Sequence, residues 1–276
     1  GETGKTIYLV ADQGLGDTLS MARFVPLVCE RSQYVHAYVQ PELLRLFQHA
    51  FANIPNLNLL PSGEQFPAAD AWSTFVSMPH ALGLSDDEIR YTSQIQAPVY
   101  GQQENWRVPD RQFHIGFAWG GSPLNDIDKH RNIPVTTFLE LYRVPGIQLY
   151  SLQVGPRAQE MNNAGMGPIV RDLTPYVRDV VDTASVLQGL DLVISCESAL
   201  GHVCSLVGKE CWLPYSWLGR DWRVGLDGSD ILWSPKHRVF RQNRAPLKNQ
   251  PDLGWNRVFM RICDALEEKM HAAGRE

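Results

Sequence analysis

Residues 190–207 read LDLVISCESALGHVCSLV, and this stretch decides the fold. The apolar run Leu190–Ile194 ends abruptly in small and polar residues, which open a second apolar run with helical spacing. This order is typical of a buried parallel strand, a tight turn and the start of a helix. Backbone N–H groups at a helix start are unpaired and the helix dipole adds positive charge, so such a turn binds phosphate well. Glu197 is placed to accept a hydrogen bond from a ribose hydroxyl, and His202 lies one turn into the helix. We therefore expect a phosphate-bearing ligand; the alternative is a turn that only packs.

Strand-like and helix-like segments alternate along the whole chain. Strands are expected at residues 6–11, 34–39, 57–60, 71–77, 114–119, 148–153, 190–194 and 208–214, and helices at 18–30, 41–51, 134–142, 181–188 and 255–271. Pro26 should kink or shorten the first helix, because proline lacks the N–H that a helix interior needs. The polar residues 98–112 indicate a connection between domains. The pattern predicts an α/β protein with two Rossmann-like, doubly wound domains facing each other across a cleft, at residues 1–108 and 109–254, and a closing helix at 255–276.

Composition sets the class of protein. The chain has 276 residues, of which 44% are hydrophobic and 20% charged, as in a folded globular protein. The sequence shows neither an apolar stretch long enough to span a membrane nor a basic-then-apolar leader. Five cysteines, an odd number without CxxC spacing, suit a reducing compartment better than a disulfide framework or a zinc site. We therefore expect a cytoplasmic protein without a structural metal.

The distribution of charge indicates where an anion would bind. The net charge of −5 argues against a general nucleic-acid binder. Residues 1–110 carry 6 basic and 12 acidic side chains, a net of −6, whereas residues 111–276 carry 19 and 18, a net of +1. An anionic ligand should therefore bind mainly to the second half.

A glycine loop, residues 12–18, follows the first predicted strand. Gly14 and Gly16 allow a tight turn, and Asp17 either caps the next helix or presents a carboxylate that takes a proton from an incoming hydroxyl. The third glycine of a dinucleotide fingerprint is replaced by Leu19, and the second strand does not end in an acidic residue. A NAD or FAD site is therefore not expected.

A second loop follows the strand at 114–119 and is rich in charge. Lys129 and Arg131 could neutralise a diphosphate. Lys129 would act as a point charge, and the planar guanidinium of Arg131 could form two parallel hydrogen bonds. Asp126 and Asp128 could equally neutralise these cations, or could bind a metal ion as an Asp-x-Asp pair.

Three blocks of sequence together carry a family resemblance. They are residues 12–23 (DQGLGDTLSMAR), 116–135 (GFAWGGSPLNDIDKHRNIPV) and 191–208 (DLVISCESALGHVCSLVG), in the same order as in the family. The chain resembles the GT-B glycosyltransferases related to bacterial heptosyltransferases, in particular the branch often fused to tetratricopeptide repeats. The likeness covers nearly the whole chain. The repeats themselves are not part of this sequence, and either they were trimmed or this member never had them.

The resemblance implies an inverting, metal-independent transfer of a sugar from a nucleotide-sugar donor, without a cofactor. Residues 1–108 would be the acceptor side and residues 109–254 the donor domain, with Asp17 as the catalytic base. The donor-binding residues would be Lys129, Arg131, Glu197, Ser198, Ala199, Leu200, Gly201 and His202, with further cleft contacts at Gly14, Gly16, Trp119, Gly120, Gln153, Asp221 and Trp222. Glu197 stands where relatives often carry Asp.

The acceptor is left open by the sequence. A glycan, a protein or a small molecule would fit; the acidic first half disfavours a nucleic acid but leaves it open as an acceptor. Two other classes share the architecture: an epimerase or hydrolase that acts on the nucleotide-sugar alone, and a sugar-nucleotide sensor that binds without turnover. Release of nucleoside diphosphate, with and without acceptors, separates the three.

Overall fold

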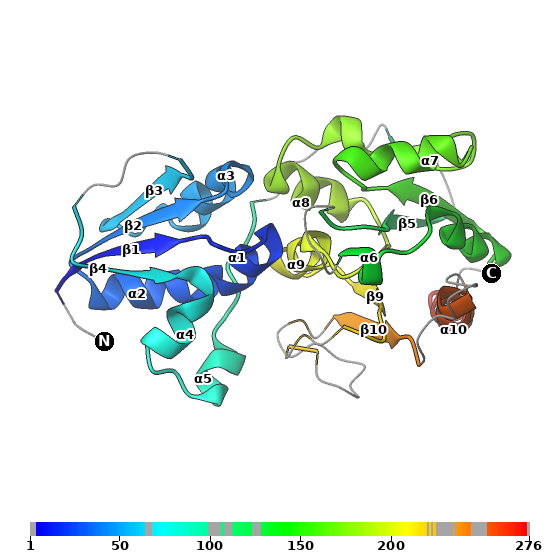
Figure 1. Ribbon diagram of the computed structural model, residues 1–276. Helices are drawn as coiled ribbons and strands as arrows, with labels where there is room; N and C mark the ends of the chain where they lie inside the picture. Colours follow the sequence, from blue (N-terminus) through cyan, green and yellow to red (C-terminus); the bar gives the residue numbers. More distant parts are fainter. Residues whose placement is uncertain are drawn as a thin grey trace.

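The computed structural model describes residues 4–63, 68–98, 106–107, 112–122, 128–219, 221, 223–224, 234, 236–243 and 253–274. Two parallel sheets form two halves that lie side by side, with helices around and between them (Figure 1). The prediction of two Rossmann-like units is therefore confirmed. The predicted boundary at residue 108 lies outside the described residues and stays a prediction. Among the helices described, none is both long enough and apolar enough to cross a membrane.

The first sheet has the order β3-β2-β1-β4 and all its neighbouring strands are parallel. Its strands are β1 (Thr6–Val10), β2 (Tyr34–Val39), β3 (Leu57–Pro61) and β4 (Ala71–Thr74). Its helices are α1 (Leu15–Met21), η1 (Ala22–Phe24), α2 (Val25–Arg31), α3 (Pro41–Ala50), η2 (Phe75–Ser77), α4 (Met78–Ala81) and α5 (Asp86–Tyr91), where η denotes a 3₁₀ helix. Parallel strands are joined by crossover connections, which are usually helices. This explains why segments with helical spacing lie between the apolar runs of this half.

Pro26 has the effect that the sequence predicts. The expected helix at 18–30 is interrupted by the 3₁₀ turn η1, and Pro26 lies in the first turn of α2. The first turn tolerates proline because its N–H groups have no partner within the helix. The break ends α1 at Met21, after about two turns.

The second sheet has the order β10-β9-β8-β5-β6-β7, again fully parallel. Its strands are β5 (Phe113–Ala118), β6 (Ile147–Ser151), β7 (Arg171–Asp172), β8 (Leu192–Ser195), β9 (Cys211–Tyr215) and β10 (His237–Arg241). Counted from β5, this is the 3-2-1-4-5-6 order of a dinucleotide-binding fold, which binds ligands at the carboxyl ends of its strands where the order reverses. The reversal lies between β5 and β8, so the loops after these two strands define the expected site.

Helices on both faces complete the second half. They are α6 (Asp128–Arg131), η3 (Val135–Arg143), η4 (Pro156–Ala158), α7 (Gln159–Asn163), η5 (Thr174–Tyr176), α8 (Val180–Gln188), α9 (Ala199–Leu206) and α10 (Leu253–Ala272). The α-helix expected at 134–142 is instead the 3₁₀ helix η3, and the sequence did not predict β7 and β10. The closing helix α10 packs against η3, β9 and β10 of its own half.

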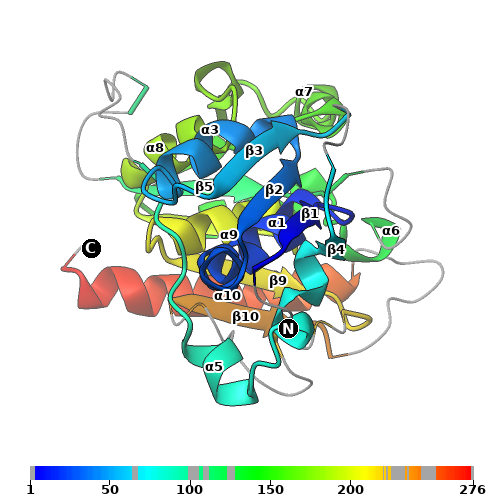
Figure 2. The same cartoon turned by 90° about the vertical axis from the view of Figure 1, so that its left-hand side faces the viewer.

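The two halves are joined by packed helices. α1 packs against α9 and α3 packs against α8, and one hydrophobic cluster continues from the first half into the second. An end-on view shows α1 and α9 overlapping at the centre of the molecule (Figure 2). At the α1–α9 contact, a Cβ on Gly16 would lie 2.8 Å from Cδ2 of His202, so only glycine permits this approach. On the α3–α8 side, Nη2 of Arg45 pairs with Oδ1 of Asp179 at 2.9 Å and of Asp182 at 2.6 Å.

Candidate active site

Two helix starts meet at the junction of the halves. α1 begins after β1 of the first sheet, α9 begins after β8 of the second, and Gly16 in the first turn of α1 lies against Ala199 and His202 of α9. Each helix start carries partial positive charge and outward-pointing N–H groups. The sequence predicted a phosphate site at the start of α9, and this stays a prediction.

Asp17 lies in the first turn of α1 but does not cap it. The N-cap is Gly14, whose backbone carbonyl accepts from the N–H of Asp17 (3.1 Å). The hydroxyl of Thr18 donates to the same carbonyl at 3.3 Å. Of the two roles offered for Asp17, the helix cap is therefore wrong. The Asp17 side chain is 39% exposed and is available at the cleft.

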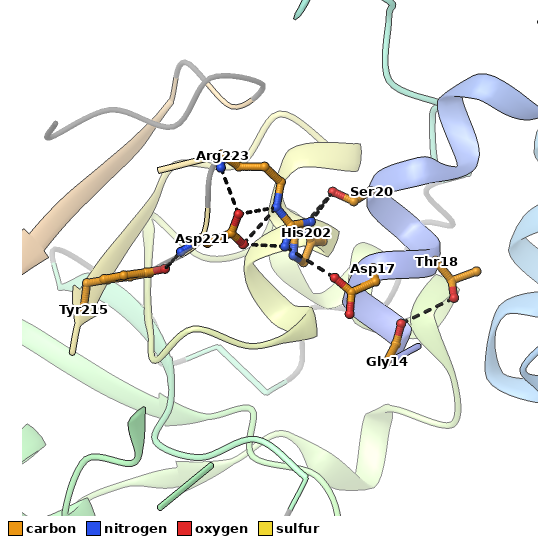
Figure 3. A network of polar contacts seen from close by, with 8 residues as sticks. All are labelled: Gly14, Asp17, Thr18, Ser20, His202, Tyr215, Asp221 and Arg223. Carbon is orange, nitrogen blue, oxygen red and sulfur yellow. Dashed lines mark hydrogen bonds and ion pairs between the residues drawn. The ribbon is translucent and has the colours of Figure 1, made fainter. Parts of the chain in front are cut away.

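Arg223 bridges the two halves (Figure 3). Its Nη1 donates to Oγ of Ser20 at 2.8 Å and its Nη2 to Oδ1 of Asp17 at 3.4 Å, both on α1. Its Nε lies 2.9 Å from both carboxylate oxygens of Asp221, and its Nη2 also donates to Oδ2 of that residue. Burial lowers the pKa of Arg223, but the contacts with Asp221 and Asp17 outweigh burial and raise it above its ordinary value. The bridge therefore carries a permanent positive charge next to Asp17.

Asp221 is itself held in place. Its backbone N–H donates to the Tyr215 hydroxyl at 3.3 Å, and its Oδ1 accepts from the backbone N–H of Arg223 at 2.9 Å. Burial raises the pKa of the Asp221 carboxyl, but the contacts with Arg223 lower it by more, to below its usual value. A Cβ on Gly219 would lie 2.1 Å from Cε1 of Tyr215, so the turn that follows β9 requires glycine. The sequence singled out Asp221 as a cleft contact, and the structure adds Arg223 to it.

The start of α9 is formed as the sequence predicted. Ser198 occupies the N-cap position with extended backbone. Among the described residues, its hydroxyl pairs with the Ser195 hydroxyl at 3.1 Å and not with an N–H of the first turn. Ala199, Leu200 and Gly201 then form that turn, with the last two buried. The backbone of the turn, not its side chains, is what this segment presents to a ligand.

Glu197 stands directly before this helix start. Burial raises the pKa of its carboxyl, and the nearby Asp221 raises it further. Arg131, Arg223 and a hydrogen bond with Tyr215 act in the opposite direction, more weakly. Arg131 is therefore near enough to act on Glu197, and its predicted part in donor binding stays a prediction.

His202 joins α9 to α1. Its Nδ1 lies 3.4 Å from Oγ of Ser20, which also accepts from Arg223. Burial, followed by the charge of Arg223, lowers the pKa of His202 to about 3. The imidazole is therefore neutral near pH 7 and contributes a hydrogen bond to the site, not a charge.

Trp119, Gly120 and Gln153 shape the loop after β5. Oε1 of the buried Gln153 accepts from the N–H groups of Trp119 at 3.0 Å and Gly120 at 2.9 Å. The Trp119 ring is fully buried, and its Nε1 donates to Glu160 at 2.8 Å. A Cβ on Gly120 would lie 2.4 Å from Cδ of Arg157. In this structure the polar groups of Trp119 and Gln153 bond to Glu160 and to the loop backbone, and a role of the three residues as cleft contacts stays a prediction.

Several predicted residues fall outside what the structure describes. Trp222 and Asp126 are among them, and the side chains of Asp128 and Lys129 are also not described. Among the described residues, no group of three or more His, Cys, Asp or Glu could hold a metal ion. The Asp-x-Asp pair is therefore not tested, and metal independence stays a prediction.

A cavity lies between α1, α9 and the strands β9 and β10. Its lining combines predicted residues with others that the sequence did not indicate: Ser20, Arg23, Gln94, Glu197, Ser198, Gly201, His202, Ser205, Leu213, Asp221, Arg223, Val224, Ser234 and His237. A second, mainly apolar depression on the first half is lined by Asp17, Met21, Val76, Pro79, His80, Leu84 and Ile89. Asp17 therefore lines this depression and contacts Arg223, which lines the first cavity.

No protein-family model matches the chain. It is 21% identical over 291 residues to the protein FlbA of Caulobacter vibrioides. The alignment covers 96% of this chain and 47% of FlbA. The chain thus spans about half the length of this curated relative.

Solved structures of similar fold are bacterial glycosyltransferases. A glycosyl transferase family 9 protein of Veillonella parvula aligns with a TM-score of 0.58 and 13% identity over 92% of this chain and 91% of that one. ADP-heptose lps heptosyltransferase II of Escherichia coli aligns with a TM-score of 0.58 and 12% identity over 96% of this chain and 99% of that one. The iron-containing dodecameric glycosyltransferase TibC of enterotoxigenic E. coli aligns with a TM-score of 0.60 and 12% identity over 99% of this chain and 77% of that one. At such identities the likeness establishes the fold, which is that of the GT-B glycosyltransferases.

Proposed function

We propose that this chain is a glycosyltransferase that moves a sugar from a nucleotide-sugar donor to an acceptor hydroxyl, with inversion and without a metal ion. The observation that carries the proposal is the meeting of two helix starts, that of α9, which would bind the diphosphate, and that of α1, which carries Asp17. The fold shared with heptosyltransferases supports it. The likeness to the branch fused to tetratricopeptide repeats remains a sequence-based prediction.

The donor diphosphate would lie on the start of α9. Expelling a nucleoside diphosphate requires that negative charge on the departing oxygen be stabilised by fixed donors and cations or by a metal ion. The N–H groups at Ser198–His202 would supply the donors, and Lys129 with Arg131 the cations. Arg131 is close enough to influence Glu197, directly before this helix start. Protein groups thus supply the positive charge that a metal ion would otherwise bring.

Asp17 would accept the proton of the acceptor hydroxyl. It projects from α1 of the first half, whereas the diphosphate would be bound by the second half, so attack and departure would occur from opposite sides. This is the arrangement of an inverting transfer in one displacement. Arg223 touches Asp17 and would position its carboxylate. The apolar depression next to Asp17 is where an acceptor would be held.

Nucleoside diphosphate release tests the proposal. ADP-heptose is the first donor to try, because TibC has been solved with ADP-D-β-D-heptose; UDP- and GDP-sugars complete the panel. Each is assayed with and without glycan, peptide and small-molecule alcohols. Release that requires an acceptor supports a transferase. Release without one indicates a hydrolase or epimerase, and binding without release indicates a sensor.

The cysteines support the predicted reducing, cytoplasmic location. All five are free thiols and all are buried. Burial raises the pKa of Cys29 to about 12 and of Cys263 to about 11, which keeps both as unreactive thiols. We propose no catalytic or redox role for them.

A further inference from the structure

The depression beside Asp17 has the size of a binding site for a small molecule. Its volume is about 360 Å³, and pockets for small ligands measure about 300–1,000 Å³. An apolar cavity of about 150 Å³ already takes up benzene, so this depression has room for an apolar group of roughly two rings. Its apolar lining residues are either buried or packed against the hydrophobic cluster of the first half: Met21, Val76, Pro79, Leu84 and Ile89.

The turn between α4 and α5 fixes one wall of this depression. Gly83 has a φ of +66°, a conformation that favours glycine, and the next N–H, that of Leu84, donates to the carbonyl of Pro79 at 3.0 Å. Ser85 then caps α5. Its hydroxyl accepts from the N–H of Glu88 at 3.3 Å, and its own N–H donates to the Glu88 carboxylate at 2.8 Å. Backbone hydrogen bonds therefore hold this wall in place, and a ligand would not have to form it.

The charges around the depression disfavour an anionic ligand. Among its described lining residues, Asp17 and His80 are the only polar side chains, and neither Lys nor Arg is present. The first turn of α5, residues 86–88, adds three exposed carboxylates. Arg223 contacts Asp17 but is also paired with Asp221. A phosphate or carboxylate in the depression would therefore lose hydration and meet charges of its own sign.

Asp17 connects the depression with the proposed reaction. Its carboxylate lines the depression, and its Oδ1 accepts from Arg223, which lines the cavity beside α9. An acceptor whose hydroxyl lies at Asp17 would thus place its neighbouring atoms in the depression. A polyhydroxylated acceptor would lose hydrogen bonds to water there, because an apolar lining cannot replace them. An acceptor with an apolar group would instead gain from burial of that group.

We infer that the acceptor is a small, uncharged alcohol whose hydroxyl is attached to an aliphatic or aromatic group, and that the depression binds this group. The inference rests on the proposed function and names the class of acceptor for the same site. It is small because a volume of about 360 Å³ suits one small molecule, and it is uncharged and apolar because of the lining. Glycans and proteins are then not the acceptors.

Transfer to a series of primary alcohols, from ethanol to octanol, tests the inference. The assay uses the whole chain and the first nucleotide-sugar of the ADP-, UDP- and GDP-sugar panel that binds. Burial of one CH₂ raises affinity by at most about fourfold, so kcat/KM should rise about two- to fourfold per CH₂ and level off once the depression is filled. Phenylethanol and naphthylethanol should also be good acceptors, whereas glycerol and glycerol phosphate should be poor ones.

Variants of the wall locate the apolar group. Leu84→Ala and Ile89→Ala should each lower the ratio of kcat/KM for octanol to that for ethanol about 3- to 10-fold. Ile54→Ala is the matched control, because Ile54 is also partly buried against the same hydrophobic cluster but does not line the depression. It should leave the ratio unchanged. The ratio compares two substrates of the same folded protein, so a loss of stability does not alter it, and the wild-type series stands even if a variant does not fold.

The outcomes separate this inference from the proposed function. If no nucleotide-sugar binds the wild type, or if release needs no acceptor, the proposed function fails and the inference with it. If release needs an acceptor but kcat/KM does not rise along the alcohol series, or if only glycerol phosphate, glycans or peptides accept the sugar, the inference alone fails. If Ile54→Ala lowers the octanol-to-ethanol ratio as much as Leu84→Ala and Ile89→Ala do, the apolar group binds elsewhere, which also overturns it.

Discussion

Asp17→Asn should strongly lower turnover and leave the fold intact. Asp17 does not cap α1, its side chain is 39% exposed, and its ion pair with Arg223 is long, at 3.4 Å. Partly exposed ion pairs contribute about 1 kcal/mol or less, so the free energy of unfolding should fall by no more than ~1 kcal/mol. A general base contributes roughly 10²–10⁴ in rate, so kcat should fall by that factor while the donor Kd stays within about twofold.

Three measurements and one control variant test this prediction. Nucleoside diphosphate release gives kcat, calorimetry gives the donor Kd, and urea denaturation gives the free energy of unfolding. Asp12→Asn is the control, because Asp12 is an exposed carboxylate five residues earlier in the same loop. It should change none of the three quantities. A lower stability of Asp17→Asn, combined with normal turnover of the folded fraction, would refute the reasoning and place the base elsewhere.

Combining Asp17→Asn with Arg223→Gln tests whether Arg223 acts through Asp17. Arg223 and Asp221 are 11% and 13% exposed, so Arg223→Gln leaves a mostly buried carboxylate unpaired. That should cost about 3–5 kcal/mol of stability, and the kinetics are measured at a temperature where the variant is folded. If Arg223 positions Asp17, its effect on kcat should largely vanish in the Asp17→Asn background. Additive effects on kcat would show that Arg223 serves another purpose.

Four further predictions follow from the same site. Lys129→Ala with Arg131→Ala should weaken binding of the nucleoside diphosphate and make the remainder less sensitive to salt, as followed by calorimetry; unchanged affinity would exclude both from the donor site. Transfer should persist in excess chelator, and a complete loss restored by Mg²⁺ or Mn²⁺ would point to the Asp-x-Asp pair. Gly16→Ala places a Cβ 2.8 Å from Cδ2 of His202, so it should lower the free energy of unfolding by about 1–3 kcal/mol in urea titrations. Wild-type stability would show that the α1–α9 contact adjusts to the added methyl group without cost. Burial lowers the pKa of His237 from 6.5 to about 4, so the unfolded chain binds a proton that the folded chain excludes. The free energy of unfolding should therefore fall as the pH drops from about 6.5 to about 4, by on the order of 3 kcal/mol, and His237→Phe should flatten this slope.

The strands and helices could largely be predicted because buried positions are apolar, and this gives the sequence a recognisable pattern. β5 and β8 are buried along their whole length, so each appears as an apolar run. β7 has two exposed residues and β10 carries three basic side chains, so neither stands out from the surrounding loop. The helix expected at 134–142 had the right apolar spacing, but the pattern of apolar residues over nine positions does not distinguish an α-helix from a 3₁₀ helix.

The candidate site was only partly readable, for a related reason. Asp17 and the start of α9 follow apolar strands directly, so their place at a strand end could be inferred from sequence alone. Arg223 and His237 reach the cleft from segments around β9 and β10 that have no recognisable local pattern. The only signal was the position of Arg223 two residues after Asp221. What brings these residues together is the packing of α1 against α9, which involves residues about 180 positions apart.

The hydrophobic cluster that continues from one half into the other limits how far the two halves could move apart. Domains within a chain normally meet through modest, rather polar surfaces and move relative to each other. Here, wide separation would expose apolar side chains of α1, α3, α8 and α9 to water and break the Arg45 ion pairs. Substrates would therefore enter along the rim of a cleft that stays nearly closed. The same coupling makes the halves lose structure together, so a melting curve should show a single transition, and neither half should persist once the other has unfolded.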